Sequence, residues 1–153
     1  MTAEIRVEQV AWDHPASVSL RAAQRAEIAE RYGTPDSEPG PAPTGDDITA
    51  FFVAFDGSDS ALGCGGLRQL NDTEAEIKRM FVRTDSRGSG VSVAILQRLE
   101  QYGREAGWHR LLLETGDGQP DAIRFYTREG YERIENFGHY AHVAESLCFA
   151  KSL

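Results

Sequence analysis

The segment from Glu74 to Leu99 constrains the fold of this chain most, because it joins a strand to a helix through a glycine-bearing loop. Apolar residues that favour β-structure lie within residues 77–82, and turn-forming residues crowd positions 85–90. From Val91 onward, apolar residues recur every three or four positions, as on one face of a helix. Unpaired backbone N–H groups and the helix dipole point toward such a loop and attract anions. The segment therefore predicts a site for a phosphorylated ligand.

Apolar patterning and turn residues predict the other elements. Residues 4–10 alternate polar and apolar side chains, which predicts a strand, and a helix is expected from an Asp13 N-cap to about Arg31, with Gly33 ending it. Further strands are predicted over residues 48–56, 61–70, 74–82, 108–115, 131–134 and 144–153, and further helices over 91–106 and 120–129. The predicted order is β-α-β-β-β-α-β-α-β-β.

Loop lengths predict how these strands pair. Short turns join the strands over residues 48–82, so they should form an antiparallel meander, and Gly63, Gly65 and Gly66 indicate a bulge or a close backbone approach. The strand–helix–strand unit from residue 74 to residue 115 requires two parallel strands. Residues 1–153 show no repeat and no second hydrophobic pattern, so we expect one domain.

Charge and hydropathy exclude several classes of protein. A formal net charge of −8 argues against nucleic acid, which requires a basic surface. No apolar run approaches the roughly 20 residues of a membrane helix, and the N-terminus lacks the apolar core of a signal peptide. We therefore expect a cytoplasmic protein without membrane association. Cys64 and Cys148 lie in strand-like contexts without C-x-x-C spacing, so we expect buried, reduced thiols and no metal.

The loop over residues 33–47 has two interpretations. Four prolines prevent a regular element, and four acidic residues, Asp36, Glu38, Asp46 and Asp47, accompany them. A solvated surface loop is the simpler interpretation. The alternative is a lid over a substrate site, whose negative charge attracts a cationic amine.

Three phosphate-binding motifs were compared with the glycine loop. A Walker P-loop requires a lysine that is absent between Lys78 and Lys151, and a Rossmann fingerprint requires a glycine where Val93 stands. The third motif fits, because Arg87-Gly88-Ser89-Gly90-Val91-Ser92 resembles the Arg/Gln-x-x-Gly-x-Gly/Ala signature of the GNAT superfamily, which transfers acyl groups from coenzyme A. The resemblance extends upstream to A-E-I-K-R-M-F-V and downstream to Q-P-D-A-I-R-F-Y-T-R-E-G-Y, and so covers about half of the chain.

The resemblance implies an α+β fold in α/β/α layers, with a GNAT-like mixed, mostly antiparallel central sheet and a parallel strand–helix–strand unit at the cofactor site. It implies that the backbone of Arg87, Gly88, Ser89, Gly90, Val91 and Ser92 holds the pyrophosphate of acetyl-CoA. The backbone of Met80, Phe81 and Val82 would pair with the pantetheine arm, which requires local disruption of the pairing between the strands at 74–82 and 108–115. Ser92 replaces the usual glycine or alanine, and Gln119 stands where the family usually has asparagine.

Acyl transfer to an amine also requires a general acid and a general base. The resemblance implies that Tyr126 protonates the leaving thiolate, whereas the structural alternative is that its ring packs on Tyr131 at the end of its helix. It likewise implies that Glu76 is the base, although Glu76 is equally explained as an ordinary salt-bridged strand residue. Glu114, a bound water or an already neutral amine are the other sources of base catalysis.

The acceptor side is the least determined part of the sequence. Asn136, Phe137 and Tyr140 are candidates for the wall of the acceptor pocket, whereas His139 and His142 are expected to be plain loop residues. The leading hypothesis is an acetyl-CoA-dependent N-acetyltransferase that acts on a primary amine of a small molecule. A protein or peptide amine is the alternative acceptor, and a non-catalytic acyl-CoA-binding sensor is the alternative class. A homodimer through the C-terminal strands is what the resemblance suggests.

Overall fold

One mixed sheet organises the part of the chain that the computed structural model describes, residues 4–35 and 39–153. Seven strands in the order β1-β2-β3-β4-β5-β7-β6 form the sheet of this described part. They are β1 (Arg6–Val10), β2 (Ala50–Phe55), β3 (Ala61–Gln69), β4 (Glu74–Val82), β5 (Arg110–Gly116), β6 (Glu132–Ile134) and β7 (Ser146–Ser152). Only the β4–β5 pair is parallel among the pairs of these strands. The predicted element order and fold class are confirmed.

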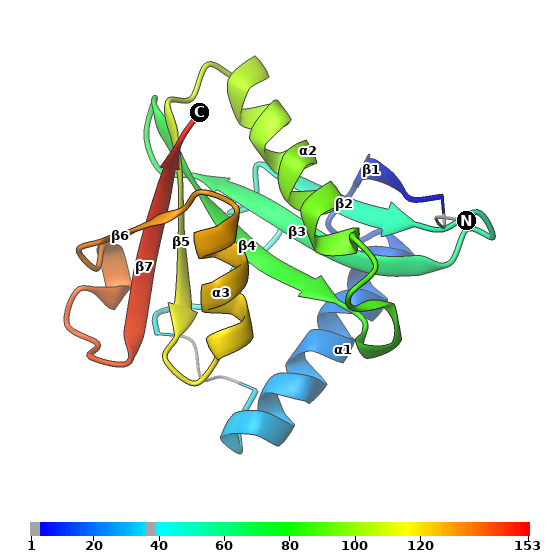
Figure 1. The fold of residues 1–153 in the computed structure, drawn as a ribbon, viewed down its shortest axis with the longest axis horizontal. Coiled ribbons are helices and arrows are strands. Elements are labelled where there is room, and N and C mark those ends of the chain that lie inside the picture. The colour runs from blue at the N-terminus through cyan, green and yellow to red at the C-terminus, as the bar shows by residue number, and fades with distance from the viewer. Residues whose placement is uncertain (1–3, 36–38) are drawn as a thin grey trace.

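Helices cover both faces of this sheet (Figure 1). The described helices are α1 (Pro15–Tyr32), α2 (Val91–Glu105) and α3 (Pro120–Arg128), with short 3-10 turns η1 (Thr84–Ser86) and η2 (Gly138–Tyr140). Phe51 and Val53 of β2 pack with Leu20 of α1, while Phe52, between them, packs with residues of α2. Because side chains alternate along a strand, two covered faces require the continuous apolar run of β2. None of the described helices is long and apolar enough to cross a membrane.

The start of α1 differs by one residue from the prediction. His14, not Asp13, is the N-cap, and its Nδ1 accepts a hydrogen bond of 3.0 Å from the Ala16 N–H. Pro15 occupies the first helical position, where its fixed φ suits the helix and its missing N–H costs nothing. The cap is therefore the residue directly before the proline. The predicted end is confirmed, since Gly33 adopts a left-handed φ of 79°.

Strands β4 and β5 separate along their length, as the resemblance implied. Their pairing covers only three register pairs, from Glu74–Arg110 to Glu76–Leu112, although β4 continues to Val82 and β5 to Gly116. Beyond Glu76 the two strands form the arms of a V. The backbone of β4 on this side is thus left without a strand partner among the described residues.

A β-bulge lies in β4 beside this opening. Phe81 pairs with Cys64 and Lys78 pairs with Gly66, so β4 carries one residue more than β3 over this interval. Arg79 takes up the extra length with a φ of 58°, in the left-handed region that costs an L-residue about 1–2 kcal/mol. The sequence suggested either a bulge or a close backbone approach at the glycines of β3. The bulge lies on β4, and the glycines of β3 allow the two backbones to approach closely. A Cβ atom on Gly63 would lie 2.7 Å from the Phe81 carbonyl oxygen.

The C-terminal strands complete the sheet beyond β5. Strand β7 pairs antiparallel with β5 over seven register pairs and with β6 on its other side, so β6 forms the edge. Both cysteines are buried and free, as expected. The single domain, the homodimer and the cytoplasmic location stay predictions.

Candidate functional site

A cleft of about 710 Å³ opens where β4 and β5 separate. Residues 76–82 of β4 and 113–116 of β5 line its sheet side, and α1, α3 and the loop between β5 and α3 line its other walls. Eight of the residues predicted for cofactor binding or catalysis line the cleft: Glu76, Met80, Phe81, Val82, Arg87, Ser92, Gln119 and Tyr126. Gly88, Ser89, Gly90 and Val91 lie in the adjoining loop and first helical turn and are not among the lining residues.

On the side that faces β5, side chains and not a strand contact the β4 backbone beyond Glu76. The Gln24 amide nitrogen of α1 donates to the Met80 carbonyl at 3.1 Å, and the Arg87 Nε donates to the Val82 carbonyl at 3.0 Å. The Gln24 Oε1 is buried and has no hydrogen-bond partner among the described residues. An orphaned acceptor of this kind is costly in an empty site and useful to a ligand that brings an N–H group. The β4 arm thus offers a polar edge to a bound molecule.

The glycine loop ends in an uncapped helix N-terminus. Gly88 and Gly90 adopt left-handed φ values of 78° and 87°, and Gly90 caps α2 without a side-chain hydrogen bond. The first-turn N–H groups of α2 have no intrahelical acceptors and can bind an anion. Arg87 fixes the start of the loop, because its guanidinium also forms a 2.8 Å ion pair with Glu27 of α1.

Tyr126 of α3 lies in the cleft wall. Its ring packs edge-on against Tyr131 with centroids 5.7 Å apart, which confirms the packing contact expected at this helix end. Only 7% of the residue is exposed, although it lines the cleft. Burial raises the pKa of the Tyr126 hydroxyl above its ordinary value. The group is therefore a protonated donor at neutral pH.

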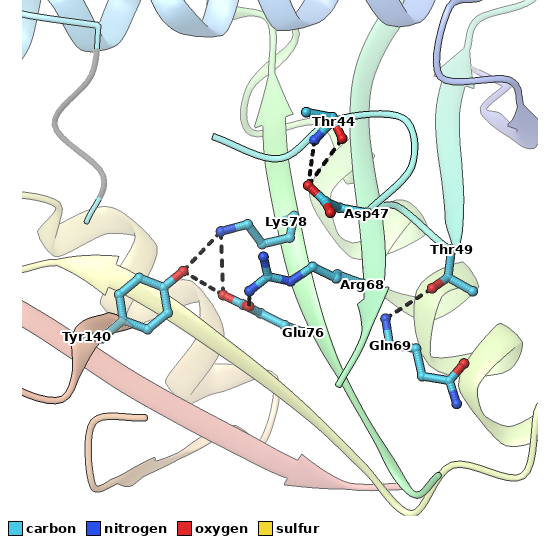
Figure 2. A network of polar contacts seen from close by, with 8 residues as sticks. All are labelled: Thr44, Asp47, Thr49, Arg68, Gln69, Glu76, Lys78 and Tyr140. Atoms are coloured by element: carbon cyan, nitrogen blue, oxygen red, sulfur yellow. Dashed lines mark hydrogen bonds and ion pairs between the residues drawn. The ribbon is translucent and has the colours of Figure 1, made fainter. Parts of the chain in front are cut away.

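Glu76 is the centre of a buried polar network (Figure 2). The Arg68 guanidinium donates to its Oε1 at 2.8 Å, and the Tyr140 hydroxyl donates to its Oε2 at 2.6 Å. The Lys78 ammonium lies 3.5 Å from Oε2 and donates to the Tyr140 hydroxyl at 2.9 Å. Both carboxylate oxygens are engaged, so the salt-bridged interpretation of Glu76 is confirmed as far as its contacts go. Glu76 also lines the cleft, so it is still a candidate for the general base.

Sequence reasoning missed most of this network. Glu76 and Lys78 alternate with apolar residues on β4, which places both on one face and is the one local signal for their proximity. Arg68 is the direct cross-strand partner of Glu76, and no pattern within the segment predicts that register. Glu114, the other candidate base, also lines the cleft and accepts a 2.6 Å hydrogen bond from the Ser146 hydroxyl.

The residues predicted for the acceptor pocket make structural contacts. Asn136, Phe137 and Tyr140 are not among the described residues that line the cleft, and their place in the acceptor pocket stays a prediction. The Asn136 amide nitrogen donates to three carbonyl groups of its own loop, and Phe137 packs on Tyr140 with centroids 5.3 Å apart. This loop holds Tyr140 in place for Glu76 and does not itself reach the cleft wall through these side chains.

The loop after α1 takes part in the cleft. Pro35 and Pro39 line it, whereas Asp36 and Glu38 lie outside the described residues. The Asp47 carboxylate accepts hydrogen bonds from the backbone and side chain of Thr44, within its own turn (Figure 2). A Cβ atom on Gly40 would lie 2.7 Å from the His139 ring, so this loop packs directly on the η2 turn. Part of this loop forms the cleft wall, as the lid interpretation requires. The Asp47 carboxylate, however, is bonded to Thr44 within its own turn.

Comparisons with known proteins point to one family. The model of the acetyltransferase (GNAT) family matches residues 17–131. An IAA acetyltransferase of Azospirillum brasilense is 37% identical over 105 residues, which are 67% of each chain. A crystal structure of a Klebsiella pneumoniae protein assigned as an acyl-CoA N-acyltransferase superposes with a TM-score of 0.82 at 27% identity, over 97% of each chain.

A second solved structure is informative about the fold. A GNAT family acetyltransferase from Elizabethkingia anophelis, with acetyl-CoA bound, has a TM-score of 0.71 and 14% identity, and the match covers 97% of this chain and 98% of that one.

Proposed function

The chain belongs to the GNAT family of acetyltransferases, and we propose that it transfers the acetyl group of acetyl-CoA directly to the primary amine of a small molecule. The observation that carries this proposal is the β4 backbone beyond Glu76, which has no strand partner on its β5 side and ends beside an uncapped glycine loop. An extended chain can add to such an arm as an extra strand while an attached phosphate meets the helix N-terminus. The acetyl-CoA bound to the Elizabethkingia relative of this fold supports the same co-substrate.

The residues of the cleft fit this co-substrate. In our proposal, the backbone of Met80, Phe81 and Val82 pairs with the pantetheine arm, and the residues from Arg87 to Ser92 hold the pyrophosphate. Gln119, whose side chain makes no cap hydrogen bond on α3, is free to contact the arm from the other wall. An N–H group of the Met80–Val82 backbone stabilises the negative charge that develops on the thioester oxygen.

Proton transfer completes the reaction. The amine nitrogen bonds to the thioester carbon while the carbon–sulfur bond breaks, so the nitrogen must lose a proton and the sulfur must gain one. We assign Tyr126 as the acid for the sulfur, since its buried hydroxyl is protonated and lines the cleft. Glu76 and Glu114 both line the cleft and are the two candidates that receive the amine proton, directly or through water.

Cleft size supports a small acceptor. A volume of about 710 Å³ lies within the range of roughly 300–1,000 Å³ that holds one drug-sized ligand. Because the pantetheine arm must occupy part of this volume, the remaining space suits a small amine better than a segment of folded protein.

A thiol-release assay with acetyl-CoA tests the proposal across a panel of small primary amines and of short peptides with free amino groups. We expect saturable, enzyme-dependent thiol release with members of the small-amine set. Release with peptides alone would favour the protein-amine alternative. Acetyl-CoA binding without release for any amine would favour the sensor.

A further inference from the structure

We propose that Tyr32 limits the size of the acceptor by closing one end of the cleft. The inference rests on the proposed function, because it concerns which nucleophiles reach the thioester. Tyr32 is the last residue of α1, is 37% exposed, and lines the cleft. The contact that its ring makes crosses the cleft.

The far end of the Tyr32 ring rests on the loop between β5 and α3. A Cβ atom on Gly118 would lie 3.1 Å from the Tyr32 hydroxyl oxygen and 3.3 Å from its Cε1, and one on Gly116 would lie 3.2 Å from the hydroxyl oxygen. The C-terminal end of α1 and this loop stand beside each other at the open end of the V (Figure 1). One wall of the cleft is therefore linked to the opposite wall by a single side chain.

The two glycines are explained by this contact. Neither Gly116 nor Gly118 is among the described residues with a positive φ, so turn geometry does not require glycine at either position. A side chain there would approach Tyr32 more closely than the about 3.5 Å at which carbon atoms pack comfortably. The sequence E-T-G-D-G thus leaves room for the ring, which indicates that the ring belongs in this position.

The ring position has a consequence for acceptors. Pro35 continues the same wall directly after α1, so a nucleophile that enters at this end must pass between stiff apolar groups. Glu76, one candidate base, lines the cleft deeper along β4. A small nucleophile can pass, whereas one that carries a bulky group next to its nitrogen would collide with Tyr32.

Two nucleophiles with the same reactive group test this without knowledge of the natural acceptor. Hydroxylamine is small, and O-benzylhydroxylamine carries an added ring. Each nitrogen attacks the thioester carbon, forms a C–N bond, loses a proton, and releases coenzyme A, whose sulfur takes up a proton. The measurement is enzyme-dependent thiol release from acetyl-CoA, expressed as the ratio of kcat/KM for the bulky and the small nucleophile.

We expect Tyr32→Ala to raise this ratio about 10-fold or more, because the discrimination is steric. Tyr32→Phe, which keeps the ring, should retain the low ratio of the wild type. Val18→Ala, at an exposed position of the same helix outside the cleft, is the matched control and should also retain it. Melting temperatures of all variants report whether the helix end is preserved.

A ratio that is equal in the wild type and in Tyr32→Ala overturns the inference, and this includes the absence of enzyme-dependent release in both. A ratio in Tyr32→Phe as high as in Tyr32→Ala also overturns it, because the ring would then not be the barrier. Calorimetry with acetyl-CoA distinguishes a failure of the proposed role of Tyr32 from a failure of the proposed function. Binding with an unchanged ratio contradicts only the role of Tyr32, whereas absence of binding contradicts the proposed function as well.

Discussion

At the scale of single residues, the Tyr126 hydroxyl should control the chemical step. Tyr126→Phe should lower kcat by about 100-fold and leave the Kd of acetyl-CoA unchanged, because the ring and its packing remain. Tyr131→Phe is a matched control, since Tyr131 packs on Tyr126 but donates its hydroxyl to Glu100 outside the cleft. An unchanged kcat in Tyr126→Phe, with chemistry shown to limit the rate, would remove Tyr126 from the mechanism.

The raised pKa of Tyr126 adds a test by pH. Because burial raises this pKa above the ordinary value of about 10, the acid form persists throughout the neutral and mildly alkaline range. Deprotonation of Tyr126 should therefore cause no loss of kcat between pH 8 and about 10. Any decline that the wild type shows in this range should persist in Tyr126→Phe. An alkaline decline in this range that disappears in the variant contradicts the assignment.

Glu76 should matter for stability as well as for activity. Removal of a buried, ion-paired carboxylate leaves Arg68 and Lys78 without it and costs about 3–5 kcal/mol, so Glu76→Gln should lower the melting temperature clearly. Glu114→Gln, at a less buried position of the same cleft, should affect stability much less. Whichever substitution lowers kcat/KM more in a folded variant identifies the base. Equal melting temperatures for Glu76→Gln and the wild type would contradict the network.

Residue contacts were predictable only where they are local. Alternation along residues 74–78 placed Glu76 and Lys78 on one face, because side chains of a strand alternate. Tyr140 lies 64 positions from Glu76, and the hydrogen bond between them depends on tertiary packing that no pattern within either segment specifies.

At the scale of elements, the Glu74–Arg110 contact fixes the closed end of the V. Hydrogen bonds from Asn71 and from Arg110, the latter at 2.7 Å, hold the pKa of Glu74 below its ordinary value. A lowered pKa stabilises the fold above the unfolded-state pKa of about 4.3, and the contribution is lost as the pH falls through the folded-state value. Glu74→Gln should therefore unfold more easily at pH 7, by about 0.5–1 kcal/mol. This difference should vanish in urea titrations near pH 3, and a difference that grows toward acid pH would contradict it.

Two glycines at opposite ends of α2 separate backbone strain from ligand binding. Gly90 and Gly107 have left-handed φ values of 87° and 81°, and a side chain would meet open space at both. Valine at either position should destabilise the protein comparably, through strain of about 1–2 kcal/mol. Only Gly90→Val should also weaken acetyl-CoA binding, by about 10-fold or more, because it blocks approach to the helix N-terminus. Equal weakening by both variants would show that the loop has no direct contact with the co-substrate.

Element boundaries followed closely from the sequence because their signals are local. Apolar periodicity and glycines fixed α2, α3 and the meander to within a few residues. The position of the bulge did not follow from the sequence, because the glycines that suggested a bulge lie on β3 while the extra residue lies on β4. A register shift belongs to a pair of strands, and the sequence of one strand does not reveal which partner carries the additional residue.

At the scale of the whole molecule, the order of the sheet decides where the cleft lies. Strand β7 pairs along the full length of β5 on the edge away from β4, so β5 keeps a complete ladder on that side where it separates from β4. The parallel unit was predictable from its strand–helix–strand order, whereas the insertion of β7 between β5 and β6 was not, because that pairing joins segments far apart in the chain. The site therefore depends on the last element of the chain as much as on the glycine loop.

A calorimetric titration of the wild-type protein with acetyl-CoA is the direct test of the proposed coenzyme A site. If the β4 arm and the glycine loop form a coenzyme A site, the titration should saturate below millimolar ligand with one molecule bound per chain. Acetyl-CoA at 100 times its Kd should also stabilise the folded protein by about 2.7 kcal/mol, which raises the melting temperature. Absence of both binding heat and thermal stabilisation at millimolar acetyl-CoA would contradict a coenzyme A site in this cleft.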